Sequence, residues 1–285
     1  MDGKLFLLLL CACECAAYLK ENRHKNESFD YLVLAQFWPA TSCYIYFGKE
    51  HCSGIPKAVT GWTIHGLWPS SEGEPPQFCN TSAKFEFNKI KGLSTQLNTQ
   101  WPYYNTSGDT TFLWAHEWEK HGTCATSVPA LNGEFNYFNS TLTLQKPLNI
   151  SGILAKHGIL PSLKVKHRPQ EFFDAIKAEL GTIPNICCVY DEASKQHYIE
   201  QVYLCYSKSF QLQDCPYVNS RRGLNRRAKR EMVQKHHPHH QSYFDDCPAQ
   251  KSKGVFFLPF RPPSMEQKET VLYYHSEFKE VISWH

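Results

Sequence analysis

The distribution of apolar residues along this chain predicts several short β-strands. Residues 31–38 (Tyr-Leu-Val-Leu-Ala-Gln-Phe-Trp) form an apolar run that Pro39 ends, as is typical of a buried strand. Residues 198–205 do not alternate strictly, but their β-branched and aromatic content indicates a second strand. Residues 255–260 have the same character, and residues 60–65 form a shorter apolar strand before a turn rich in Gly and Pro.

Other segments have the spacing of amphipathic helices. The clearest is 171–180, which Gly181 ends, and its apolar positions are Phe172, Phe173, Ile176 and Leu180. Two more helices are predicted around 90–97 and over 148–156, the second ending near Gly158. Strands and helices interleave irregularly, without a βαβ or internal repeat. This pattern predicts a single α+β domain with a central antiparallel sheet flanked by helices.

Length and composition fit one large core and a leader segment. The 285 residues are 42% hydrophobic and 14% aromatic, and the formal net charge of +3 permits a polyanionic partner without demanding one. Residues 1–17 combine Lys4, an apolar run over 5–10 and two small residues at the end, which predicts a secretory signal peptide. Its apolar run is too short to span a bilayer, and no later stretch is suited to a membrane helix.

The expected domain covers residues 18–263, and we assign no role to the tail, 264–285. Within the domain, about 219–242 form a basic, histidine-rich insertion. It is interpreted first as a solvated loop, and otherwise as an electrostatic contact with RNA or an acidic cell surface. The run 227–230 (Arg-Ala-Lys-Arg) resembles a furin-type processing site, and metal capture by the four histidines of 236–240 is a further alternative.

Residues 113–124 contain a dense group of ionisable side chains. Four ionisable side chains occupy six positions there: His116, Glu117, Lys120 and His121. In a helix with about 100° per residue, these four share one broad face, and Trp114 and Trp118 point toward a core. We expect Gly122 to close the helix in a left-handed conformation. Such crowding of charge gains nothing from burial, which indicates a functional site.

A shared metal ion does not fit this spacing. A zinc-binding H-E-x-x-H pair needs histidines four residues apart, whereas His116 and His121 are five apart, about 140° around a helix, with Lys120 between them. We therefore expect no metal and no other cofactor. The same groups suit a phosphate diester, because a lysine can hold its non-bridging oxygens and histidines can transfer protons near neutral pH. His65, expected at the end of a strand and followed by Gly66, would supply the second half of an acid/base couple.

Residues 62–69 (Trp-Thr-Ile-His-Gly-Leu-Trp-Pro) and 116–124 (His-Glu-Trp-Glu-Lys-His-Gly-Thr-Cys) together resemble the two active-site segments of the T2 family of ribonucleases. The resemblance runs from about residue 31 to about 260. It implies the family's α+β fold and an endoribonuclease that cleaves single-stranded RNA without metal, by transphosphorylation through a 2′,3′-cyclic phosphate to 3′-phosphate products.

The resemblance also implies roles for individual residues. His121 and His65 form the catalytic pair, as base and acid in the first step. Glu117 and Lys120 stabilise the phosphorane, and Trp68 stacks on a base, although the sequence also allows a core tryptophan there. His116 holds the phosphate. Where many relatives have an acidic residue after Trp-Pro this chain has Ser70, which leaves any purine preference open.

Removing the leader leaves nine cysteines, and secretion implies that most are paired. The resemblance implies four disulfides: Cys43–Cys52, Cys79–Cys124, Cys188–Cys247 and Cys205–Cys215. Either Cys187 or Cys188 is then left over, as a buried free thiol or in an intermolecular disulfide.

Glycosylation sequons fit a secreted protein and occur at Asn26, Asn80, Asn105, Asn139 and Asn149. We expect a monomer that is secreted or resides in the endosomal or lysosomal lumen. The competing class is a secreted signalling, immunomodulatory or cytotoxic glycoprotein that acts through a lectin or cell-surface receptor. The presence of every expected active-site residue favours the enzyme.

Overall fold

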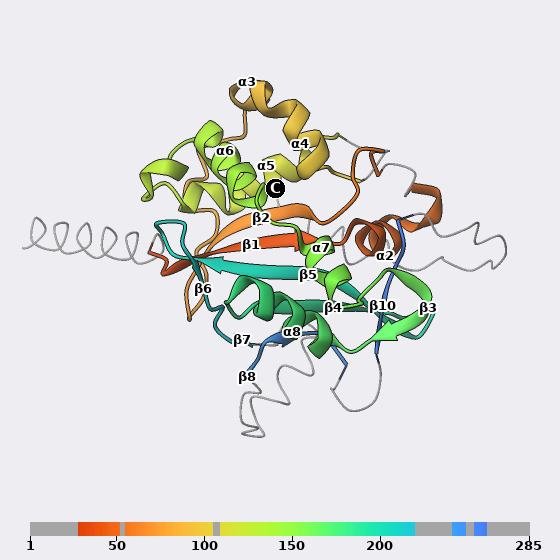
Figure 1. Ribbon diagram of the computed structural model, residues 1–285. Coiled ribbons are helices and arrows are strands. Elements are labelled where there is room, and N and C mark those ends of the chain that lie inside the picture. Colours follow the sequence, from red (N-terminus) through yellow and green to blue (C-terminus); the bar gives the residue numbers. More distant parts are fainter. Residues whose placement is uncertain (1–27, 52–54, 105–108, 220–240, 249–253, 261–285) are drawn as a thin grey trace, which may run out of the picture.

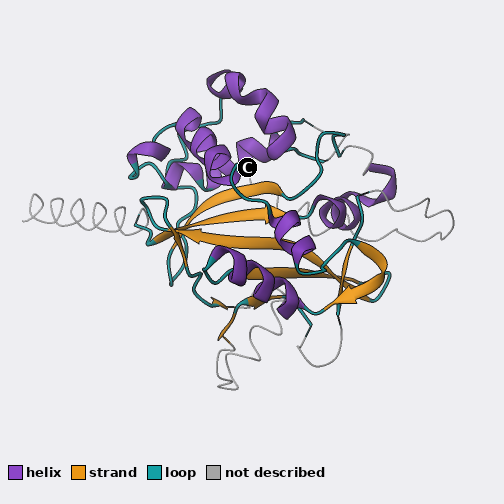
Figure 2. Cartoon of the chain, in the orientation of Figure 1, coloured by secondary structure: helices purple, strands orange, loops and turns teal. Residues whose placement is uncertain are grey.

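The computed structural model describes residues 28–51, 55–104, 109–219, 241–248 and 254–260. An eight-stranded sheet crosses the molecule (Figures 1 and 2), and five of its strands follow the order β2, β1, β5, β10, β3. Their bounds are β2 Thr63–Ser70, β1 Tyr31–Phe37, β5 Gln196–Tyr206, β10 Val255–Phe257 and β3 Ser162–His167. The others are β4 Asn185–Asp191, β6 Leu212–Gln213 and β9 Phe244–Asp245, while β7 Val218–Asn219 and β8 Gln241–Ser242 form a separate pair.

The sheet is mainly antiparallel, as the sequence predicts. The strand β1 is antiparallel to β2 and β5, and β4 is antiparallel to β5. Two pairs are parallel, β10 with β5 and β4 with β9, so the whole sheet is mixed. Parallel pairing needs a long connection, and β9 and β10 each reach their partners after one.

Helices lie on both sides of this sheet. They are α2 Pro39–His51, α3 Phe87–Ile90, α4 Ser94–Gln100, α5 Phe112–Lys120, α6 Glu134–Gln145, α7 Ile150–Lys156 and α8 Pro169–Leu180. Short 3-10 turns cover Lys91–Leu93, Gly122–Cys124 and Pro129–Leu131. Figure 1 shows α3 to α6 gathered next to β2, whereas α7 and α8 pack on each other and α8 contacts β4. Among the described residues, none of the helices combines the length and apolar character needed to cross a bilayer.

The central strand explains why its sequence does not alternate. In β5 every residue from Tyr198 to Tyr206 is buried. A strand covered on both faces has no polar face, so its sequence shows a run and not a period of two. The amphipathic helix 171–180 also appears, extended to begin at Pro169, and Gly181 caps it with a φ of +71°. Phe172, Phe173 and Ile176 are buried beneath it.

Two local expectations were wrong, and one helix was not expected. The strand β1 ends before Pro39, as expected, but Pro39 is also the first residue of α2, a helix that the apolar pattern did not reveal, because proline fits the first turn of a helix. The strand β2 does not stop at His65 but runs through Pro69 to Ser70, since an edge strand tolerates proline. Gly122 is not left-handed; it begins a 3-10 turn.

Disulfides join the described cysteines in the pairs expected from the resemblance: Cys79–Cys124, Cys188–Cys247 and Cys205–Cys215. Cys43 is also disulfide-bonded, and its expected partner, Cys52, lies outside the described residues. Cys187 is the buried free thiol. Residues 1–27, 220–240 and 261–285, which hold the expected leader, most of the basic insertion and the tail, also lie outside the described residues.

Candidate active site

His65 occupies a β-bulge. Along the β1–β2 ladder Ala35 faces Gly66 and Gln36 faces Ile64, so His65 has no counterpart on β1. A bulge bends its strand and redirects a side chain, and bulges are enriched next to active sites. The imidazole stacks on Phe37 with ring centroids 3.9 Å apart, and the backbone oxygen of His65 accepts a hydrogen bond of 2.8 Å from Trp101 Nε1. The imidazole ring and the backbone of His65 are therefore both held in place.

The carboxyl group of Glu117 faces His65 from helix α5. Its Oε1 lies 3.6 Å from His65 Nε2, and its Oε2 accepts a hydrogen bond of 2.8 Å from Trp68 Nε1. Glu117 is fully buried, and this burial raises its pKa to about 8, against the opposing effects of the Trp68 hydrogen bond and the charge of Lys120. The raised pKa favours the protonated carboxyl group, which can donate a hydrogen bond.

Gly66 lets these groups approach one another. A Cβ at this position would lie 2.0 Å from Glu117 Oε2 and 2.3 Å from Trp68 Nε1. Any other residue would push the Glu117 carboxyl group or the Trp68 indole out of place. The glycine after His65 thus leaves room for the carboxyl group of Glu117 and the indole of Trp68.

His116 is neutral over most of the physiological range. Burial and the positive charge of Lys120 lower its pKa to about 4, and Glu119 opposes this shift only in part. Lys120 thus acts on both His116 and Glu117, as expected for four groups on one helix face. Trp114 and Trp118 are buried on the opposite side, also as expected.

His121 departs from the regular helix. The helix α5 ends at Lys120, and His121 has φ −116° and ψ −47° at the start of the 3-10 turn. One ligand atom each of His116, Glu117 and His121 lie within 4.8 Å of one another. The argument from helical spacing against a shared metal ion was therefore wrong about the distance, because the helix does not continue through His121. The charge of Lys120 remains an argument against a cation there.

The 3-10 turn also explains why residue 122 is a glycine. A Cβ on this residue would lie 2.4 Å from Cε3 of Trp118. Glycine is needed here for close packing against the buried face of α5, and not for a left-handed backbone. The Cys79–Cys124 bridge closes the turn, and Phe78 N donates a hydrogen bond of 2.9 Å to Lys120 O. The C-terminal end of the catalytic helix is thus tied to the segment after β2.

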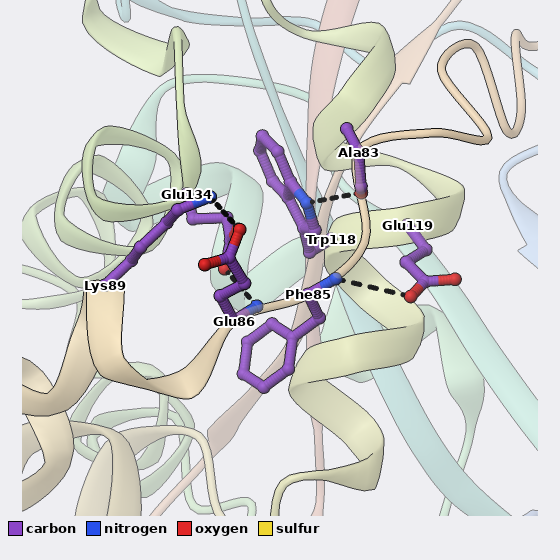
Figure 3. A network of polar contacts seen from close by, with 7 residues as sticks. All are labelled: Ala83, Phe85, Glu86, Lys89, Trp118, Glu119 and Glu134. Atoms are coloured by element: carbon purple, nitrogen blue, oxygen red, sulfur yellow. Dashed lines mark hydrogen bonds and ion pairs between the residues drawn. The ribbon is translucent and has the colours of Figure 1, made fainter.

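A polar network holds α5 against residues 83–86 (Figure 3). Trp118 Nε1 donates to Ala83 O at 3.0 Å, and Phe85 N donates to Glu119 Oε1 at 3.3 Å. The neighbouring carboxylate of Glu134, on α6, accepts from Glu86 N at 2.9 Å and pairs with Lys89 at 3.2 Å. The segment before α3 is fastened in this way to α5 and α6.

Trp68 is not a pure core residue, which the sequence had left open, but lies between the two histidines and a cavity. Its indole is half-buried, with the ring centroid 5.4 Å from that of His121 and 4.9 Å from that of His65. It also borders a cavity of about 330 Å³, whose other aromatic walls are Tyr31, Tyr203 and Tyr217. Ser70, Glu72, Asn185 and Asp245 add polar groups to the same cavity. Aromatic walls with a few polar groups suit a nucleobase.

Gln201 is a site residue that the sequence pattern did not single out. Its Oε1 lies 2.7 Å from Nδ1 of His65, across the sheet from β5. The available signal was a glutamine inside the apolar run 198–205, where a buried polar side chain needs a partner.

Comparison with known proteins gives consistent results. Residues 29–215 match the model of the ribonuclease T2 family. The chain is 42% identical to ribonuclease Oy of Magallana gigas over 193 residues, which are 66% of this chain and 88% of that protein. It is 36% identical to human ribonuclease T2 over 217 residues, 75% of this chain and 79% of the relative.

Solved structures agree with the sequence relatives. The crystal structure of human RNase T2 superposes with a TM-score of 0.56 and 37% identity, covering 66% of this chain and 90% of that one. Ribonuclease MC1 from bitter gourd seeds superposes with a TM-score of 0.58 and 32% identity, covering 66% and 94%.

Proposed function

This chain belongs to the ribonuclease T2 family and is an endoribonuclease of that type, and from this premise we propose how it cleaves RNA. Single-stranded RNA is cut without metal by transphosphorylation. The 2′-hydroxyl attacks the adjacent phosphorus, the 5′-oxygen leaves, and the resulting 2′,3′-cyclic phosphate is then hydrolysed to a 3′-phosphate. RNA carries its own nucleophile, so the protein needs only to move protons and stabilise the phosphorane.

In the first step His121 removes the proton of the 2′-hydroxyl and His65 gives a proton to the leaving 5′-oxygen. In the second step the roles reverse, with His65 activating water and His121 protonating the 2′-oxygen. One observation carries this proposal. The carboxyl group of Glu117 has His65 Nε2 3.6 Å from one oxygen and lies within 4.8 Å of a ring nitrogen of His121. A phosphate that contacts Glu117 is then within reach of both imidazoles.

Glu117 and Lys120 stabilise the phosphorane in different ways. Lys120 offers a fixed positive charge. Glu117, with its pKa raised by burial to about 8, offers an O–H donor at neutral pH without the repulsion that a carboxylate would exert on a phosphate. His116, whose pKa is lowered to about 4, holds the phosphate as a neutral hydrogen-bonding ring.

We place the base on the 2′-hydroxyl side against Trp68. The cavity beside this indole has aromatic walls, and base–aromatic stacking contributes roughly 1–3 kcal/mol while accepting every base. Because Ser70 replaces the acidic residue of many relatives, we propose broad base usage. Unpaired bases can enter the cavity freely, which favours single strands over duplexes.

The cellular setting is also part of the proposal. Residues 1–17 direct the chain into the secretory route, and the protein acts as a secreted or endosomal or lysosomal monomer. Three sequon asparagines in the described part of the chain, Asn80, Asn139 and Asn149, are exposed and accessible to glycan transfer. Disulfides in the structure are in keeping with an oxidising compartment.

A direct assay tests this function. Purified full-length protein is incubated with single-stranded homopolymer RNAs, and the products are separated at short and long times. We expect the 2′,3′-cyclic phosphate to appear first and to decay into the 3′-phosphate. Products that carry 5′-phosphates from the outset would contradict the proposal, because water would then have attacked in place of the 2′-hydroxyl.

A further inference from the structure

Two consecutive residues of β5, Glu200 and Gln201, lie behind His65. Along the β4–β5 ladder Cys187 faces Gln201 and Cys188 faces Ile199, so Glu200 has no counterpart and forms a bulge. Consecutive residues of a regular strand project to opposite faces, whereas a bulge can bring two neighbours to one side. Both side chains are buried, with 4% and 7% exposure, and they hydrogen-bond to each other.

Gln201 defines which nitrogen of His65 carries a hydrogen. Its Oε1 lies 2.7 Å from His65 Nδ1, and a carbonyl oxygen can only accept. Nδ1 must therefore donate, which leaves Nε2, the atom that faces Glu117, free to gain and lose a proton.

Glu200 defines which end of the Gln201 amide faces the histidine. A carboxylate accepts hydrogen bonds and the amide N–H₂ group donates them, so the hydrogen bond between these side chains turns the amide oxygen toward His65. The carboxylate also polarises the amide and increases the negative charge on its oxygen.

Glu200 has further partners on α2 and β4. Tyr46 Oη, on α2, donates to Glu200 Oε1, and Cys187 Sγ, on β4, lies 3.9 Å from Oε2. Burial raises the pKa of Glu200 to about 7; hydrogen bonds from Tyr46 and Gln201 lower it, and the nearby charges of Asp245 and Asp246 raise it. Glu200 and His65 therefore titrate as a coupled pair, because a protonated imidazole favours the ionised carboxylate and the carboxylate favours the protonated imidazole.

We propose that Glu200 and Gln201 form a positioning relay behind His65, which fixes the tautomer of the imidazole and favours its protonated form. The relay rests on the proposed role of His65 as general acid. The negative charge of Glu200 polarises the amide of Gln201, and the amide oxygen then stabilises the N–H of Nδ1. This helps His65 hold the proton that the leaving oxygen needs. Gln201 and Glu200 touch no reacting atom, so they act only through the histidine.

Nuclear magnetic resonance of the free, full-length protein labelled with ¹⁵N tests the relay. The ring nitrogens of His65 are followed through a pH titration in the wild type, in Glu200→Gln and in Gln201→Leu, with the signals assigned from His65→Phe. This readout needs no RNA, so it reports on the relay even if His65 proves not to be the acid. Cleavage rates measured in parallel report on the proposed function.

We expect the wild-type ring, when neutral, to carry its hydrogen on Nδ1. In Glu200→Gln the titration midpoint of His65 moves down by about half a pH unit, as the loss of a nearby negative charge requires. In Gln201→Leu the two tautomers mix, and RNA cleavage falls by roughly tenfold or more. A wild-type ring with its hydrogen on Nε2, or an unchanged midpoint in Glu200→Gln, would overturn the relay.

Two further variants distinguish an effect of the relay from a general loss of stability. Glu134→Gln removes another buried carboxylate, in the network of Figure 3, and should lower the melting temperature without moving the His65 midpoint. Tyr46→Phe removes only the hydroxyl that donates to Glu200. Tyr46→Phe should move the His65 midpoint in the same direction as Glu200→Gln, and it tests the relay even if Glu200→Gln fails to fold. If the midpoint stays unchanged in both variants, the relay is refuted.

Discussion

The indole N–H of Trp68 donates a hydrogen bond of 2.8 Å to Oε2 of Glu117. One tryptophan therefore borders the candidate base cavity and also holds the carboxyl group that we propose contacts the phosphate. A base that shifts this indole would move the hydrogen bond to Glu117 with it. In the proposed mechanism, substrate binding and transition-state stabilisation would thus be linked through a single side chain.

If Glu117 acts as a protonated donor, a neutral donor should replace it. We expect Glu117→Gln to keep kcat within about tenfold of the wild type, because the amide N–H₂ can donate and the amide oxygen can accept from Trp68. Glu117→Ala should lower kcat by about 100-fold or more, as the loss of a preorganised donor does in other enzymes. Steady-state kinetics on a dinucleotide decide this; equal losses in both variants would show that the ionised carboxylate is required.

Glycine at position 66 is required for the site to assemble. In Gly66→Ala the new Cβ would lie 2.0 Å from Glu117 Oε2 and 2.3 Å from Trp68 Nε1, so the carboxyl group or the indole must move. We expect a loss of about 1–3 kcal/mol in the free energy of unfolding, typical of overpacking, and a fall in kcat/KM of about 100-fold. Gly92→Ala is the matched control, because nothing lies within 4 Å of its Cβ. A Gly66→Ala enzyme as active as this control would refute the packing argument.

Stability should fall as the pH rises from 6.5 to 8. Burial raises the pKa of Glu117 from 4.5 to about 8 and that of Glu200 from 4.5 to about 7, so over this window the unfolded chain has already released protons that the folded protein retains. Below this window the lowered pKa of His116, about 4, has the opposite effect, because the unfolded imidazole binds a proton as the pH falls through 6.5.

Thermal melts at pH 6.5 and pH 8 measure how much the stability changes with pH. We expect Glu117→Gln combined with Glu200→Gln to flatten this dependence relative to the wild type, since neither amide titrates. A double variant with the same pH dependence as the wild type would show that these carboxyl groups are not the source.

The sequence alone identified the candidate groups His65, His116, Glu117, Lys120 and His121, because they lie in two short segments that resemble those of one family. The structure places His65 next to Glu117, and His116 and His121 close to the same carboxyl group. The sequence could not show that His65 sits in a bulge, since a bulge depends on the pairing of two strands far apart in the chain. Gln201 escaped notice for the same reason. Its partner, His65, is 136 positions away, and nothing local marks the contact.

The fold, too, has parts that the sequence predicts and parts that it does not. Helix α8 and its glycine cap were predictable because amphipathic period and stop signal are local. Helix α2 was not, because Pro39 reads equally well as the end of a strand and as the first residue of a helix. The misplaced end of α5 had the largest consequence. It made His116 and His121 seem too far apart to share a ligand.

Cleavage should survive chelation of metals. Lys120 already supplies the positive charge that a metal would contribute, and its charge affects both His116 and Glu117. We expect the same kcat/KM with and without EDTA after extensive dialysis. Loss of activity on chelation, restored by one divalent cation, would instead assign the group formed by His116, Glu117 and His121 to that cation.

The roles of the two histidines can be separated with two substrates that differ only in their leaving group. RNA needs a proton on its departing 5′-oxygen, whereas a uridine 3′-(4-nitrophenyl phosphate) expels a phenolate that needs none. We expect His65→Ala to lose about 10²–10⁴-fold in rate on a dinucleotide but little on the aryl ester, and His121→Ala to lose a similar factor on both. Equal losses of His65→Ala on the two substrates, or rescue of His121→Ala by the aryl ester, would contradict the assignment of His65 as the acid and His121 as the base.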